Sequence, residues 1–248
     1  VGKTAIMLSL AGPNSKKAKV LLVNVQHITV NEQQIYLVPQ YKLVGGVIDA
    51  DGSMGPELHN RHCSVTACLP PFRKFVMSKA SLRLNQATTV ADSMLASGLL
   101  FNCHTWCGYT PSNIQLVSSR LAHIYGTAIH DRVTVLNGVT SRLSDVQVYS
   151  RAARADATRQ IRLRRLLFLP RLLRQASDIL LFVLDATLDT PGAFASMIQS
   201  DLIWLYEHSA RYAKLDSIPT FVEWLQLALS VSWKSSVKQA FYDDMRMY

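Results

Sequence analysis

The spacing of hydrophobic and polar positions changes near residue 52. Before that point, short apolar or alternating segments are separated by polar turns, a pattern typical of β-strands. The polar run from Gly12 to Lys17 lies between two such segments and predicts a hairpin. We therefore predict a small antiparallel β-region with extended segments at 3–10, 19–25, 27–30, 34–38 and 41–48.

From Pro56 onward, apolar positions recur at about every 3.6 residues, which is the period of an amphipathic helix. Pro56 and Glu57 follow Gly55, and a proline with an acid is typical of a first helical turn. Pro170 falls inside one predicted helix, where a missing backbone donor favours a kink. The predicted helices cover 56–68, 71–78, 82–101, 111–125, 142–155, 158–174, 177–188, 194–214 and 219–242.

These patterns predict an α+β fold, in which a small antiparallel β-region precedes a mostly α-helical remainder. With 248 residues and 49% hydrophobic content, the chain is long enough for one or two packed domains. We divide it into residues 1–52, 53–140 and 141–248. The last region is rich in arginine.

The net charge of +9 and the pI of about 9.5 favour a polyanionic partner, nucleic acid before a membrane surface. The longest apolar stretches, 94–101 and 179–184, are much shorter than the roughly 20 residues of a membrane span. We expect no membrane partner. Four cysteines and no visible export signal predict free thiols and an intracellular location, nuclear or cytoplasmic and not secreted.

Eight arginines and a single acid, Asp156, lie between residues 151 and 174. On one continuous helix, five of these arginines would fall within about 140° of one another. Such a stripe is either a solvated face or a track along a phosphate backbone. If it is a track, changing four of these residues to Gln should flatten the salt dependence of binding by roughly 3–4 units of slope and leave the fold intact. The five are Arg151, Arg154, Arg159, Arg162 and Arg165, and Arg159 is kept in that variant.

A short motif gives the strongest indication of function. Residues 40–48 are an apolar run with two glycines, followed by an Asp/Gly turn and by Pro56-Glu57. This segment resembles the "YKYLGG" primer grip that closes the palm of reverse transcriptases of non-LTR (LINE-type) retrotransposons. In that family the primer grip holds the 3′ end of the growing strand against the catalytic site. The residues that match it are Tyr41, Lys42, Leu43, Val44, Gly45 and Gly46.

Other segments resemble the same family in the same order. Residues 1–7 are similar to the end of the motif "N-x-x-K-T-E-x-M", and the resemblance makes Lys3 the candidate motif lysine near the incoming nucleotide. Residues 97–106 are similar to "S-x-L-L-Y-G-x-x-T-W", with Asn102 where the family usually has Gly. Residues 162–177 are similar to "R-L-R-x-L-x-R-L-x-x-x-A-P", although Pro170 is unusual there.

The resemblance implies a C-terminal fragment of an RNA-directed DNA polymerase. Residues 1–52 would be the end of the palm, 53–140 a helical thumb and 141–248 a helical extension. The implied partners are RNA and DNA, as primer and template, together with the missing N-terminal part of the polymerase. The complete enzyme would use Mg²⁺, but the fragment has no catalytic carboxylates, so we expect no metal, no cofactor and no activity from the chain alone.

Phe241-Tyr242-Asp243-Asp244 is similar to the polymerase box "F/Y-x-D-D", whose paired carboxylates bind two metal ions. A catalytic box lies at a hairpin tip and precedes the Lys-Thr motif. This one follows a helix-like run at the opposite end of the chain. We therefore interpret the similarity as accidental.

Two alternatives remain open at this point. One is a helical nucleic-acid-binding module without polymerase ancestry. The other is a truncated P-loop NTPase, in which Gly2-Lys3-Thr4 would end the phosphate loop and residues 179–185 would be a strand that ends in an acid.

The chain has four cysteines, which we interpret as small apolar core residues rather than zinc ligands. They are Cys63, Cys68, Cys103 and Cys107.

Overall fold

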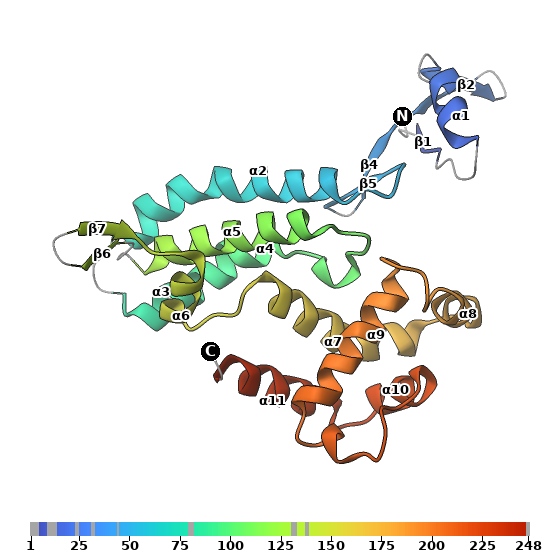
Figure 1. The fold of residues 1–248 in the computed structure, drawn as a ribbon. Helices are drawn as coiled ribbons and strands as arrows, with labels where there is room; N and C mark the ends of the chain where they lie inside the picture. Colours follow the sequence, from blue (N-terminus) through green and yellow to red (C-terminus); the bar gives the residue numbers. More distant parts are fainter. Residues whose placement is uncertain are drawn as a thin grey trace. The chain divides into compact units, whose positions relative to one another are not determined.

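The computed structural model describes residues 5–8, 14–22, 25–30, 33–43, 45–78, 82–129, 133–136 and 139–246. The fold is α+β and mostly helical, as the sequence predicted. Contacts between Cα atoms divide the chain into a first unit, Val1–Asn60, and a second unit, Arg61–Tyr248 (Figure 1). Helices from both of the regions predicted at 53–140 and 141–248 pack within the second unit.

The first unit contains a three-stranded sheet in the order β1-β3-β2, formed by β1 (Ala5–Ile6), β3 (Gln33–Leu37) and β2 (His27–Val30). Strands β2 and β3 are antiparallel, as predicted, but β1 pairs with β3 in parallel. Parallel strands need a crossover connection, and the helix α1 (Ser15–Leu22) lies in it. The predicted hairpin between residues 3–10 and 19–25 is therefore wrong, because residues 19–22 are helical.

The predicted single strand at 41–48 is instead a hairpin. Its strands β4 (Gln40–Leu43) and β5 (Gly46–Asp49) are antiparallel, with Leu43 opposite Gly46. Gly45 has a φ of 82° in the turn, a conformation that glycine adopts without a steric penalty. The carboxylate of Glu57 accepts a hydrogen bond of 2.6 Å from the backbone N–H of Val47, which joins the following helix to β5.

The second unit is built from helices, and α2 (Gly55–Pro71) runs into it from the first unit. A further hairpin, β6 (Val133–Leu136) and β7 (Val139–Arg142), is a feature that the sequence did not predict. The predicted helix at 219–242 is two helices, separated at residues 229–232. The helices are α3 (Leu84–Ala91), α4 (Ser97–Leu99), α5 (Pro111–Ala128), α6 (Asp145–Ala152), α7 (Ala157–Gln175), α8 (Asp178–Ala186), α9 (Phe194–His208), α10 (Phe221–Ala228) and α11 (Trp233–Arg246). Two π-helical segments, Phe72–Met77 and Asp92–Ala96, follow α2 and α3.

Side-chain caps explain where several helices start. Ser144 and Thr110 accept hydrogen bonds from the backbone N–H three residues later, and Asp156 does the same at the start of α7. Such caps satisfy donors that have no partner inside the helix. The end of α6 has a different cause, because Ala153 adopts a left-handed conformation with φ 51°. This residue breaks the helix that the sequence predicted at 142–155.

Helix α7 lies at the centre of the second unit and packs against α5, α9, α10 and α11 (Figure 1). Its apolar side joins a fully buried cluster that includes Leu202 of α9 and Trp233 of α11. Pro170 does not end the helix, although it has no N–H to donate to the carbonyl of Leu166. The indole Nε1–H of Trp233 donates to that carbonyl instead, at 2.8 Å.

Candidate nucleic-acid interface

The predicted primer-grip residues lie in the first unit, on the β4–β5 hairpin. Tyr41 and Lys42 are exposed, and the part of the chain that the structure describes contains no acidic partner for Lys42. Gly45 lies in the turn and Gly46 begins β5. Lys3 and Val44 lie outside the described residues, as does the side chain of Leu43.

The five predicted arginines do not share one helix. Arg151 is exposed on α6, Arg154 lies in the linker after the left-handed Ala153, and the other three are on α7. The expected stripe along one continuous helix face is therefore wrong. The predicted helices at 142–155 and 158–174 already separated Arg154 from Arg159. The left-handed turn at Ala153 was not predicted, because alanine is a strong helix former.

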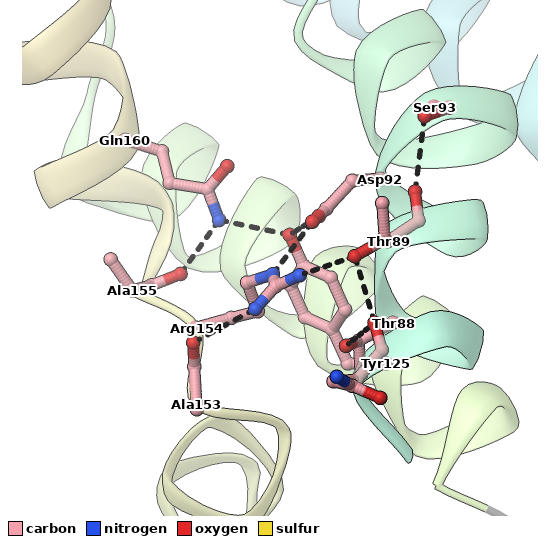
Figure 2. A network of polar contacts seen from close by, with 10 residues as sticks. Thr88, Thr89, Asp92, Ser93, Tyr125, Ala153, Arg154, Ala155 and Gln160 are labelled. Carbon is pink, nitrogen blue, oxygen red and sulfur yellow. Dashed lines mark hydrogen bonds and ion pairs between the residues drawn. The ribbon is translucent and has the colours of Figure 1, made fainter. Parts of the chain in front are cut away.

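Arg154 is held inside a polar network that fixes the linker between α6 and α7 (Figure 2). Its Nε donates to Asp92 at 2.6 Å, and Asp92 also accepts from the hydroxyl of Tyr125 at 2.7 Å. Gln160 donates to Tyr125 at 3.1 Å and to the carbonyl of Ala155 at 2.7 Å. Burial, with the neighbouring Asp92, raises the pKa of Tyr125, so its hydroxyl stays a donor. Each of the three guanidinium nitrogens of Arg154 thus has a partner within the fold, since Nη1 donates to the carbonyl of Ala153 and Nη2 to the hydroxyl of Thr89.

Arg159 pairs with two carboxylates. Its Nε is 2.6 Å from Asp244 on α11, and its Nη1 is 2.7 Å from Asp156 at the start of α7. Asp243, the other member of the Asp-Asp pair, accepts hydrogen bonds from Gln239 on the same helix. The pair thus lies on a helix, where Asp244 is buried against an arginine rather than set at a hairpin tip.

Arg165 and Arg162 both bind Asp201 on α9, at 2.7 Å and 3.2 Å. Arg165 is only 2% exposed and also donates to the hydroxyl of Tyr109 at 3.1 Å. Arg162 lies over the ring of Trp204, 4.7 Å from its centroid. The expectation that these guanidinium groups stay in water on an exposed face is wrong for Arg165, because tertiary packing places it under α9.

Helix α7 nevertheless carries six arginines and no acidic residue, so the remaining three matter for its charge. Arg164 is half-buried, whereas Arg171 and Arg174 are exposed. Within the described residues none of the three has an acidic partner. We call them the basic face of α7.

His104 lies beside the basic face of α7. Its ring packs against that of Phe168 of α7 in a tilted orientation, with centroids 4.1 Å apart. Burial lowers the pKa of His104, and the positive charges of Arg164 and Arg171 lower it further. Arg164 and Arg171 therefore lie close enough to His104 to influence its protonation.

Beside α7, the surface of the second unit has three adjoining hollows. Arg154 and Tyr242 line both a hollow of about 850 Å³ and a second hollow of about 420 Å³. Arg159 lines both the first hollow and a third hollow of about 360 Å³, which extends to Trp204. We call the three together the arginine trough. Three of the five predicted arginines therefore line one depression, which is formed by α5, α6, α7, α9 and α11.

The cysteines do not form a metal centre within the described part of the chain, where no group of three or more His, Cys, Asp and Glu side chains could hold an ion. All four are free thiols. Cys103 is buried, as expected of a core residue, but Cys63 and Cys68 are exposed on α2, so the core interpretation is wrong for these two. Their positions on the outer side of a helix explain the difference.

The thiols should differ in reactivity. Burial raises the pKa of Cys103 to about 11, while Arg164 and Arg165 oppose this shift in part. At pH 8 the folded chain should therefore be alkylated at Cys63 and Cys68 and protected at Cys103, since the thiolate is the reactive form. Mass spectrometry of iodoacetamide-treated protein, with and without urea, measures this. Equal modification of Cys103 in both conditions would contradict the burial.

Comparison with protein-family models, curated proteins and solved structures finds no match to this chain. No helix among the described residues is both long and apolar enough to cross a bilayer.

Residues 179–185, the predicted strand of the P-loop alternative, are helical in α8. That alternative therefore loses its acid-bearing strand.

Proposed function

We propose that this chain is part of an RNA-directed DNA polymerase of a non-LTR retrotransposon and contributes primer and template binding rather than the catalytic carboxylates. The order of the sequence motifs supports the family. The β4–β5 hairpin, which carries the primer-grip-like residues, is compatible with it. A helical nucleic-acid-binding module without polymerase ancestry is the alternative. An "F/Y-A-D-D" sequence encoded in frame within about twenty to thirty codons upstream of Val1 would distinguish them.

The basic face of α7 is the observation that carries nucleic-acid binding. Arg164, Arg171 and Arg174 have no acidic partner among the described residues, so their charge is available to an external anion. Each phosphate that such a cation neutralises releases condensed counterions and makes binding salt-dependent. Because phosphates carry no direct base information, we expect little sequence preference.

The test is a double variant of the two exposed residues, Arg171→Gln with Arg174→Gln. Loss of two phosphate contacts should reduce the slope of log K against log salt by roughly 1.4–1.8 units, depending on whether the probe is single-stranded or duplex. The matched control is Lys234→Gln with Lys238→Gln on α11, which removes the same charge from exposed positions elsewhere. Its slope should stay close to that of the unmodified chain.

A second measurement separates local binding from a general charge effect. The NMR-detected pKa of His104 should rise in the Arg171→Gln variant, because one neighbouring positive charge is gone. It should also rise when an oligonucleotide binds the basic face of α7. A slope and a His104 pKa that are both unchanged by the arginine substitutions would contradict the proposal.

A further inference from the structure

The arginine trough differs from the basic face of α7 in its charge balance. Of the arginines that line it, Arg154, Arg159 and Arg162 are each within 3.2 Å of a carboxylate. Arg246, at the rim, has a weak partner, since its Nη1 lies 3.8 Å from Asp243 and its side chain is 79% exposed. Arg164, which also belongs to the basic face of α7, has no acidic partner among the described residues. Paired charges attract phosphate weakly. Any affinity of the trough must therefore come mainly from other contacts.

The lining of the trough supplies apolar and aromatic surface instead. Tyr242 of α11 is 54% exposed and lines both of the larger hollows, beside the half-buried Met245. Val146 of α6 is 77% exposed at the largest hollow. The amide of Gln115, also in the lining, has no partner among the described residues. An exposed aromatic ring and an uncommitted amide in the lining of one hollow suit a planar heterocycle that also forms hydrogen bonds.

Arg164 connects the two surfaces, because it belongs to the basic face of α7 and also lines the hollow of about 420 Å³. A strand whose phosphates follow the basic face can therefore place bases in the trough. The hollows have the size of small-molecule pockets, roughly 300–1,000 Å³, so they accept single bases rather than a helix. In a duplex, the bases are stacked inside and their faces are not available.

We propose that the arginine trough binds unpaired bases of single-stranded nucleic acid, with Tyr242 as the stacking platform. This inference rests on the proposed function, because phosphate contacts at the basic face bring the strand to the trough. The proposed function does not specify the form of the nucleic acid, whereas this inference predicts that single strands bind more tightly than duplexes. The part of the affinity that the bases contribute arises from stacking and does not change with salt.

The experiment measures fluorescence anisotropy with a labelled single-stranded oligonucleotide and with the duplex of the same sequence, at several salt concentrations. Tyr242→Ala should weaken single-strand binding by about 5- to 150-fold, the range for one lost base stack, with the salt slope unchanged. Duplex binding should stay the same. Tyr242→Phe keeps the ring and should retain most of the affinity.

Phe75→Ala is the matched control, because Phe75 is also an exposed aromatic residue, at 64%, and lies outside the trough. It should not change single-strand binding. Circular dichroism checks that each variant is folded. If Tyr242→Ala binds single strands normally, or weakens both forms alike, while the Arg171 and Arg174 substitutions still lower the slope, the inference is wrong and the proposed function stands. Absence of any binding by the unmodified chain would overturn both.

Discussion

Replacing Asp201 by alanine is expected to lower the free energy of unfolding by about 3–5 kcal/mol, the usual cost of removing one partner of a buried ion pair. Asp201 is 5% exposed and Arg165 is 2% exposed, so the guanidinium would remain buried without its carboxylate. In the described part of the chain, the hydroxyl of Tyr109 would then be its remaining side-chain acceptor. Urea unfolding followed by circular dichroism gives the free energy.

Two further variants test whether burial of the ion pair causes the loss of stability in Asp201→Ala. Asp243→Ala removes a carboxylate whose partner Arg246 is 3.8 Å away and exposed, and it should cost less than about 1 kcal/mol. Combining Asp201→Leu with Arg165→Met replaces the buried charges by apolar groups and should recover much of the stability lost in Asp201→Ala. Equal costs for Asp201→Ala and Asp243→Ala would show that the buried pair has no special role.

Replacing Trp233 by alanine should cost about 3–5 kcal/mol, as is typical when a large aromatic side chain is removed from a core. Trp233 is 1% exposed and lies beside the rings of Tyr212 and Trp224. Part of this cost belongs to its hydrogen bond with the Leu166 carbonyl, which Pro170 leaves without a helical donor. Denaturant unfolding measures the loss.

A double-mutant cycle isolates that hydrogen bond. Trp233→Phe keeps a buried ring but leaves the Leu166 carbonyl unsatisfied, at a cost of about 1–3 kcal/mol for the lost partner. In a Pro170→Ala background, the new backbone N–H can donate to the same carbonyl, so the cost of Trp233→Phe should fall. An identical cost in both backgrounds would mean that the indole acts through packing alone.

The basic face of α7 and the arginine trough have different parts in the proposed binding. The basic face should set the salt dependence, because Arg171 and Arg174 are exposed and have no acidic partner among the described residues. The trough should set the preference for unpaired bases through Tyr242. The substitutions in the two surfaces are therefore expected to change different measured quantities, the salt slope and the single-strand affinity.

Local patterns in the sequence determined most of the helices and the strands β2 and β3, but they did not show the turn at Gly45 that divides the predicted strand at 41–48 into β4 and β5. A helical period, a capping residue such as Thr110 or Ser177 and a Gly-rich turn each act within a few residues, so they can be recognised without knowing the fold. Predictions from the same patterns were wrong where contacts between distant segments set the secondary structure. Residues 19–22 belong to a helix in the crossover connection that the parallel pairing of β1 with β3 requires, and that pairing is not visible in the local pattern.

The sequence by itself also established the excess of arginine and the missing backbone donor at Pro170. It could not establish which arginines would find carboxylates. Arg165 pairs with Asp201, and Arg159 with Asp244, across 36 and 85 residues. Such pairs form only when helices distant in the sequence pack together, and the same packing brings Trp233 to the Leu166 carbonyl. The tertiary structure thus decided which cations hold the fold together and which remain available to a partner, because charge is a local property of the sequence and charge pairing is not.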